Sequence, residues 1–151
     1  MSDLISKRCE TAAINLLARK EYSQAALEEK LKLKGYHNAT VARVLLKLKE
    51  DGLQSDERFA SCYARSRIER GCGPVRIQYE LQNYGIPAEI IVQIIDEYKE
   101  EWVETAKKIK TKKFGNKIST SLNEQIKQKK FLLYKGFDFE IIKKAMNTNY
   151  D

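Results

Sequence analysis

The chain has 151 residues, of which 42% are hydrophobic and 32% are charged, and its net charge is +7. That length suits one ordinary domain or a short array of small units. No apolar run approaches the ~20 residues of a membrane-spanning helix, and the first residues lack the apolar core and cleavage site of a signal peptide. The three cysteines form no CxxC pair, which indicates a reduced protein of the cytoplasm.

Positive charge is concentrated in the last third of the sequence. Residues 1–100 contain 16 Lys and Arg against 15 Asp and Glu, whereas residues 101–151 contain 12 against 6. A basic segment of this kind is typical of a protein that contacts nucleic acid or an acidic protein surface. Solubility alone is the alternative explanation.

Apolar residues recur at helical spacing in three segments of the chain. They fall at positions i, i+3 and i+4, and in two segments also at i+7, which indicates one face of an amphipathic helix. The three stripes are Val41, Val44, Leu45 and Leu48; Ile91, Ile94, Ile95 and Tyr98; and Ile142, Ala145 and Met146.

A glycine precedes each stripe by six residues. The glycines are Gly35, Gly85 and Gly136, separated by 50 and 51 residues, and each stands in the pattern Leu-x-x-x-Gly-apolar. Glycine at the end of a helix adopts the left-handed conformation at little steric cost. The sequence therefore predicts an internal repeat of about fifty residues.

Each repeat has room for three helices, so we predict an all-α protein, an elongated tandem array of three three-helix repeats. The predicted repeats cover residues 1–52, 53–98 and 99–151. The predicted helices cover residues 6–19, 23–34, 38–51, 56–70, 74–84, 87–98, 100–114, 119–135 and 138–147. A continuous helix through residues 98–102 is an alternative. The predicted N-caps are Ser23, Asn38, Ser55 or Asp56, and Asp138, and Pro74 and Pro87 are expected at first helical positions.

The stretch RIERGCGPVRIQYEL, residues 67–81, could be a phosphate-binding loop, a reactive-thiol site or a helix boundary. A phosphate loop needs a preceding strand and a trailing Gly-Lys-Ser/Thr, and both are missing. Cys72 has no neighbouring base, because His37 is the only histidine in the chain. We interpret Gly71 to Gly73 as the end of one helix and Pro74 as the start of the next. No catalytic residue, metal or cofactor is predicted, and the protein is not expected to be an enzyme.

Basic residues are the candidate binding residues. Those of the second repeat are arginines, whose planar fork binds carboxylates and phosphates; those of the third are lysines, which bind phosphate backbones without reading sequence. The candidates are Arg58, Arg65, Arg67, Arg70, Arg76, Lys107, Lys108, Lys110, Lys112, Lys113 and Lys117. The alternative for Arg67 and Arg70 is a structural role, either in a pair with Glu80 or on the C-terminal carbonyls of the preceding helix. Four aromatic residues of the third repeat are expected in the core rather than as base-stacking platforms: Phe114, Phe131, Tyr134 and Phe137.

The pattern LxxKGY…LxxLxxDGLQSDERFAxxYxRxRxxRGxGPxRIxxELxxxGI resembles the RecX family, bacterial regulators of the recombinase RecA. The residues that carry the resemblance are Gly35, Leu53, Ser55, Asp56, Phe59, Ala60, Tyr63, Arg67, Gly71, Gly73, Pro74, Ile77, Glu80, Leu81, Gly85 and Ile86. It extends to LLARKEYSQAALEEKLKLKGY and to the closing FLLYKGFDFEIIKKAM. In two departures, Cys72 stands where an aromatic residue is expected, and Gln128 stands where the other repeats have Leu27 and Ile77.

The resemblance implies a tandem array of three-helix units without enzymatic activity or a cofactor. It implies binding to RecA filaments on single-stranded DNA and inhibition of filament growth, ATP hydrolysis and strand exchange, and hence a role in recombination, DNA repair and the SOS response. Direct contact with the single strand and a monomeric, cytoplasmic state are expected with it. Two alternatives remain: a sequence-independent nucleic-acid-binding helical module that acts without RecA, and a scaffold for another acidic protein.

Overall fold

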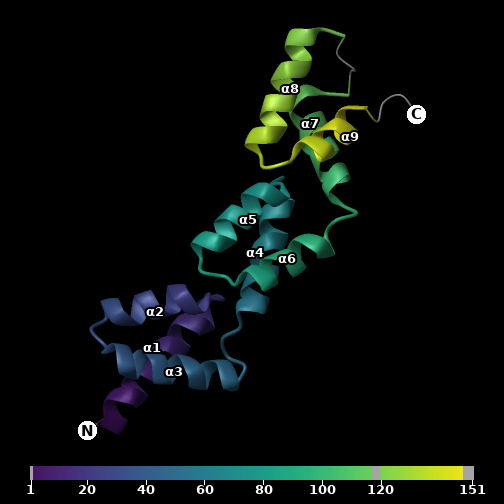
Figure 1. Ribbon diagram of the computed structural model, residues 1–151. Helices are drawn as coiled ribbons and strands as arrows, with labels where there is room; N and C mark the ends of the chain where they lie inside the picture. Colours follow the sequence, from purple (N-terminus) through teal and green to yellow (C-terminus); the bar gives the residue numbers. More distant parts are fainter. Residues whose placement is uncertain (1, 117–119, 148–151) are drawn as a thin grey trace. The chain divides into compact units, whose positions relative to one another are not determined.

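The computed structural model describes residues 2–116 and 120–147, and within these ranges it contains nine α-helices and no strand (Figure 1). The all-α prediction is therefore confirmed. The helices are α1 (Ser2–Arg19), α2 (Gln24–Leu33), α3 (Asn38–Glu50), α4 (Asp56–Glu69), α5 (Pro74–Asn83), α6 (Ala88–Glu97), α7 (Trp102–Phe114), α8 (Leu122–Tyr134) and α9 (Phe139–Asn147). None of these described helices is long and apolar enough to cross a membrane.

The chain forms two compact units. The amino-terminal unit comprises residues 1–62 and 81–90, and the carboxy-terminal unit comprises residues 63–80 and 91–151. Helices α4, α5 and α6 each begin in one unit and end in the other. We call α1–α3, α4–α6 and α7–α9 the first, second and third helix groups.

Side-chain caps fix three of the helix starts that the sequence predicts. The hydroxyl oxygens of Ser23 and Ser55 accept hydrogen bonds from the N–H groups of residues 26 and 58, and a carboxylate oxygen of Asp138 accepts one from residue 141. Such bonds satisfy backbone donors that a helix leaves unpaired in its first turn. Pro74 is the first residue of α5, as predicted.

The predicted start of the third helix at residue 38 is confirmed, but its predicted N-cap and several other boundaries are wrong. Asn38 is already helical, and the extended residue before it, His37, is the N-cap and makes no side-chain cap bond. Pro87 lies just before α6 rather than in its first turn. A turn closed by the Glu101 N–H on the Tyr98 carbonyl, at 2.8 Å, separates α6 from α7, so no continuous helix joins them. Ser121 is an N-cap that the prediction missed, because α8 starts at Leu122 and not at residue 119.

The same glycine turn ends the second helix of every group. Gly35, Gly85 and Gly136 have φ angles of 98°, 76° and 102°. The N–H of the following residue donates to the carbonyl five residues back: Tyr36 to Leu31 at 3.4 Å, Ile86 to Leu81 at 3.1 Å and Phe137 to Leu132 at 3.1 Å. These are Schellman turns, and the three leucines that accept the bonds are fully buried.

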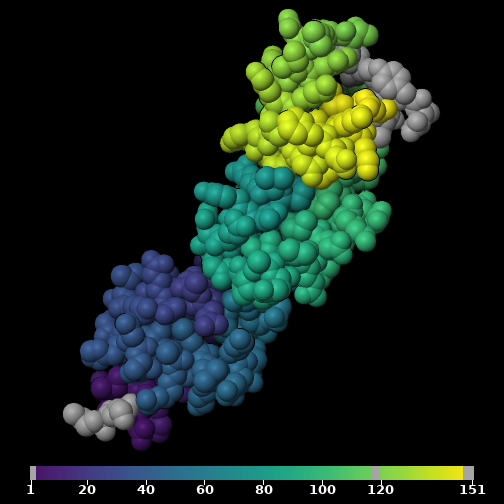
Figure 2. All heavy atoms as spheres, in the orientation of Figure 1, coloured from purple at the N-terminus to yellow at the C-terminus, as the bar shows by residue number. Residues whose placement is uncertain are grey.

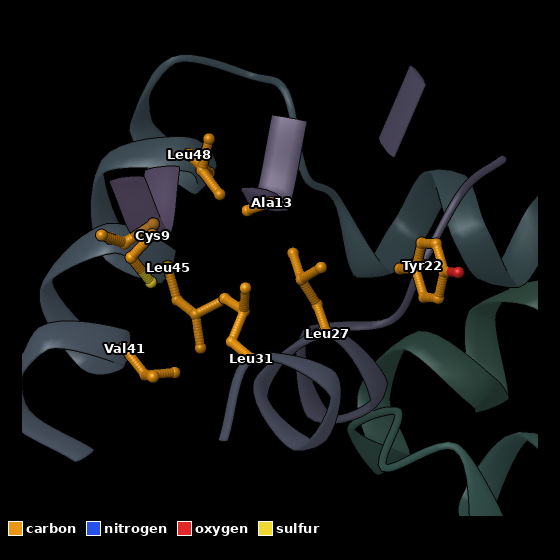
Figure 3. Packing of buried hydrophobic residues seen from close by; sticks show 9 residues of the cluster. Cys9, Ala13, Tyr22, Leu27, Leu31, Val41, Leu45 and Leu48 are labelled. Carbon is orange, nitrogen blue, oxygen red and sulfur yellow. The ribbon is translucent and has the colours of Figure 1, made fainter. Parts of the chain in front are cut away.

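The first group packs around a continuous apolar core (Figure 3). Side chains from all three helices meet there, and removing a Leu side chain of this kind from water contributes about 2 kcal/mol. The buried set is Cys9, Ala13, Tyr22, Leu27, Leu31, Val41, Val44, Leu45 and Leu48. Burial raises the pKa of the Cys9 thiol, so this cysteine packs as a small apolar residue rather than reacting.

The third group keeps the predicted register. Gln128 is 5% exposed and occupies the buried position of Leu27 and Ile77. The helices α7, α8 and α9 all contact one another. Their buried apolar residues are Trp102, Ala106, Leu132, Phe137, Ile142 and Ala145.

The loop at residues 71–73 ends α4, as predicted, but it also docks the third group. Within the carboxy-terminal unit, the Gly73 N–H donates to the Lys135 carbonyl at 2.8 Å, and the Val75 N–H donates to the Gly136 carbonyl at 2.9 Å. On the face shown in Figure 2, the surfaces of the α8–α9 turn and of the α4–α5 segment abut. We call this contact the backbone joint.

Two glycines make the backbone joint sterically accessible. A methyl group on Gly136 would lie 2.8 Å from the backbone nitrogen of Arg76 and closer still to its Cβ. A methyl group on Gly73 would lie 2.7 Å from the nitrogen of Phe137. Both distances are too short for real Cβ contacts, so side chains at these positions would separate the two segments.

The glycine turns allow the conformational cost of a substitution to be separated from its packing cost. Gly35 has nearly the same φ as Gly136, but a methyl group added to it would meet nothing within 4 Å. We expect Gly35→Ala to destabilise the fold by about 1 kcal/mol, through the left-handed conformation alone. Gly136→Ala should cost about 3 kcal/mol, because it also overpacks the backbone joint. Urea unfolding followed by circular dichroism measures both; equal losses would contradict the packing role.

Candidate functional site: the basic surface

The excess of positive charge lies in the carboxy-terminal unit. That unit contains 17 Lys and Arg against 11 Asp and Glu, a net charge of +6, whereas the amino-terminal unit contains 11 against 10. The candidate residues differ in whether their charged groups already form hydrogen bonds or ion pairs within the protein.

Arg58 is held by three interactions inside the amino-terminal unit. Its Nε donates to Glu21 at 2.5 Å, and its two terminal nitrogens donate to the carbonyls of Gly52 and Leu53 at 3.1 and 3.0 Å. The side chain thus links the α3–α4 connection to Glu21, in the α1–α2 connection. Its predicted binding role competes with this structural one.

Arg67 is bound by Glu80, which is the structural alternative that the sequence left open. Its Nε and one terminal nitrogen donate to the two carboxylate oxygens at 2.9 and 3.1 Å, and the Tyr63 hydroxyl donates to the first of them at 3.0 Å. Burial alone would lower the pKa of Arg67, but the hydrogen bond to Glu80, together with electrostatic interactions with Cys72, Glu80 and Tyr63, outweighs burial and holds that pKa above its ordinary value. We assign Arg67 to the scaffold.

Arg76 occupies an intermediate position. Its Nε lies 3.5 Å from the second oxygen of Glu80, and its guanidinium lies 5.4 Å from the centre of the Tyr134 ring. The side chain is 33% exposed. It is therefore oriented by two partners while part of its surface stays open to solvent.

Arg65, on α4, and Arg70, one residue after α4 ends, are two further exposed arginines. Both side chains reach solvent, and within the described ranges no side-chain hydrogen bond or ion pair engages either guanidinium. The backbone carbonyl of Arg70 accepts a hydrogen bond from the Lys135 ammonium at 3.4 Å. These two guanidinium groups are available to a partner.

The lysines of α7 divide in the same way. Lys108 and Lys112 are exposed one helical turn apart, and Lys113 is exposed with its ammonium 5.0 Å from the centre of the Phe131 ring. Lys107 is half-buried and lies 3.5 Å from Glu104. Lys117 lies outside the described residues.

Lys110 belongs to the interior of the third group, contrary to its predicted binding role. It is 9% exposed, and its ammonium donates to the Ala145 carbonyl at 3.4 Å. Burial lowers the pKa of Lys110, and the charge of Lys107 lowers it further. The sequence spacing indicated this burial. On α1, Cys9 and Ala13 are a buried pair four residues apart, and Ala106 and Lys110 form the same kind of pair on α7, with lysine in place of alanine.

Tyr134 was expected in the core and is instead 73% exposed. The prediction holds for Phe137, which is 1% exposed, while Phe114 and Phe131 are half-buried and pack edge to face at 5.5 Å. Sequence reasoning also missed Tyr79, which is 64% exposed on α5. The sequence contained a signal for this exposure. Tyr79 lies midway between Ile77 and Leu81, which are four residues apart and buried, so it falls on the opposite face of the helix.

Comparison with known proteins identifies the three helix groups. Three family models match in chain order: "RecX, first three-helix domain" over residues 9–48, "RecX, second three-helix domain" over residues 55–94 and "RecX, third three-helix domain" over residues 99–146.

Curated relatives and a solved structure agree with these matches. The chain is 41% identical to Regulatory protein RecX of Legionella pneumophila (strain Corby) over 134 residues, 89% of each chain. It is 36% identical to Regulatory protein RecX of Acinetobacter baylyi over 146 residues, 97% of this chain and 91% of the relative. The crystal structure of RecX from Lactobacillus salivarius matches with a TM-score of 0.87 over 98% of this chain and 97% of that one. At 24% identity, this last match supports the fold alone.

The Arg67–Glu80 pair should contribute measurably to stability. Glu80→Ala leaves the Arg67 guanidinium partly buried without its carboxylate, so we expect a loss of about 2 kcal/mol in the free energy of unfolding. Glu104→Ala is the matched control, because Glu104 forms an exposed pair with Lys107, and it should cost under about 0.5 kcal/mol. Similar losses in urea unfolding would contradict the scaffold role.

Removing the buried ammonium should stabilise the protein. Lys110→Met keeps an aliphatic side chain and removes a desolvated charge, so we expect about 1 kcal/mol of added stability near pH 7. The pKa of Lys110 is lowered from 10.5 in the folded state. The unfolded chain therefore binds more protons as pH approaches that value, and the wild-type protein gains stability relative to the variant. The advantage of Lys110→Met in urea unfolding should therefore shrink near pH 10, and an advantage that stays constant with pH would contradict the desolvation of this ammonium.

Proposed function

The chain belongs to the RecX family, and from that premise we propose that it binds RecA filaments on single-stranded DNA. In this proposal it inhibits filament growth, ATP hydrolysis and strand exchange, and so regulates recombination, DNA repair and the SOS response in the bacterial cytoplasm. It acts as a monomer and contributes no cofactor. The observation that carries the proposal is the match to three consecutive RecX three-helix domains across the chain.

The distribution of available charge supports a polyanionic partner. A RecA filament on DNA offers nucleic-acid phosphates as well as protein carboxylates, and both bind guanidinium and ammonium groups. The exposed cations Arg65, Arg70, Lys108, Lys112 and Lys113 all belong to the unit with a net charge of +6. They are the residues to which we assign the contact; Arg76 contributes from its half-buried position.

The assay is the single-stranded-DNA-dependent ATPase of RecA with this protein added below stoichiometry. We expect the rate to fall and filaments to shorten in electron micrographs. Reversing four charges together (Arg65→Glu, Arg70→Glu, Lys108→Glu and Lys112→Glu) should raise the half-inhibitory concentration roughly tenfold or more, because several attractive pairs become repulsive.

Lys30→Glu with Lys34→Glu provides the control, since both lysines are exposed on the amino-terminal unit. It should leave the half-inhibitory concentration within about twofold of the wild type. An unchanged ATPase rate with the wild-type protein would contradict the proposed function. Equal effects of the control and the fourfold reversal would contradict the assignment to these residues.

A nucleic-acid-binding module that acts without RecA is the second candidate, favoured by the net charge of the carboxy-terminal unit. It predicts tight binding to labelled single-stranded DNA, with a steep dependence on salt, and no change in the RecA ATPase rate.

A further inference from the structure

An exposed aromatic and basic surface lies at the backbone joint of the carboxy-terminal unit. Its exposed apolar and aromatic members are Val75, Tyr79 and Tyr134, with 52%, 64% and 73% of their surface accessible. Arg76 lies over the Tyr134 ring, and Lys135, the residue after Tyr134, is hydrogen-bonded to the backbone of Arg70. We call the set Arg70, Val75, Arg76, Tyr79, Tyr134 and Lys135 the joint patch.

The joint patch is preorganised by the backbone. Val75 and Lys135 belong to the two segments that the hydrogen bonds Gly73 to Lys135 and Val75 to Gly136 hold together. The Lys135 ammonium is aimed by its bond to the Arg70 carbonyl, at 3.4 Å. Arg76 and Tyr134 meet across the same contact, with the guanidinium 5.4 Å from the ring centre. A surface fixed in this way loses little conformational entropy when it binds.

The carboxylate that contacts the joint patch through Arg76, Glu80, is already engaged. Both oxygens of Glu80 interact with Arg67, and Tyr63 and Arg76 approach one oxygen each. Among the described residues no ion pair includes Arg70 or Lys135, so both keep their charge for a ligand. Exposed aromatic rings beside unneutralised cations are the combination that binds unpaired nucleotides, with bases stacking on rings and phosphates pairing with cations.

We propose that the joint patch binds single-stranded nucleic acid directly. A base stacks on the open face of Tyr134, a neighbouring base packs on Tyr79, and the phosphates between them pair with Arg70 and Lys135. Because a duplex hides the faces of its bases, the patch discriminates in favour of the single strand. The inference deepens the proposed function and rests on it for the source of the strand, which a RecA filament carries.

The test is fluorescence anisotropy with a labelled oligodeoxythymidylate of about 15 nucleotides and no RecA. Tyr134→Ala should weaken binding about tenfold, and Tyr79→Ala severalfold. Arg70→Ala should reduce the slope of log affinity against log salt by about 0.7, the value of one phosphate contact on a single strand. A duplex of the same length should bind more weakly and should not respond to Tyr134→Ala.

Leu33→Ala is the matched control for Tyr134→Ala. Leu33 lies two residues before Gly35, as Tyr134 lies two residues before Gly136, and it is 79% exposed. Its replacement should leave the oligonucleotide affinity unchanged. Thermal unfolding of each variant confirms that an exposed truncation has not disturbed the fold.

Two results would overturn the inference. One is an oligonucleotide affinity that Tyr134→Ala does not change. The other is a Tyr134→Ala variant that loses affinity for DNA-free RecA but not for the oligonucleotide, which would make the joint patch a protein contact. Neither result touches the RecA ATPase assay with the wild-type protein, so this inference can fail while the proposed function stands.

Discussion

The fold depends on the absence of a Cβ atom at one recurring turn. Gly136 satisfies two requirements at once: its backbone has a φ of 102°, and Arg76 lies against the space that a side chain would fill. The turn that ends this helix is thus also the point where a segment of the preceding helix group docks. Gly85 shows the same combination in the amino-terminal unit, where a methyl group would lie 2.6 Å from Ala25. A methyl group at the third turn, on Gly35, would meet nothing within 4 Å, so the left-handed φ is common to all three turns whereas docking accompanies two of them.

The docking determines which charges remain available. Contact at the backbone joint fixes the start of α5, and Glu80, one helical turn after Arg76, then collects Arg67, Tyr63 and Arg76. The Glu80 carboxylate is already paired in that network, so the network offers no acidic partner to Arg70 or Lys135. Packing and electrostatics are therefore coupled: the contact that builds the third group onto the second also exposes a positive surface.

The periodic features were predictable from the sequence, whereas the fate of individual polar residues was not. Glycine spacing and apolar stripes depend on local geometry, so the helices, the turns and buried positions such as Leu31 and Leu132 follow from them. Lys110 and Lys108 have the same side chain and nearly the same position, yet only tertiary packing decides that the first is buried. Tyr134 and Phe137 are both aromatic and three residues apart, but the glycine turn between them sends one outward and the other into the core. Arg58 and Gly73 are engaged by segments that the sequence alone does not bring together.

In the proposed contact with a single strand, affinity and selectivity have separate structural origins. The exposed lysines of α7 sit on flexible stems and act as point charges, so they attract any polyanion and their effect falls as salt rises. Tyr134 and Arg76 are held by the backbone joint, and stacking on a ring is screened little by salt. At physiological ionic strength the Debye length is about 8 Å, so in the proposed contact the charges guide the protein to a polyanion while the fixed rings distinguish an unpaired strand from a duplex. A joint loosened at Gly136 would accordingly retain the attraction and lose the discrimination.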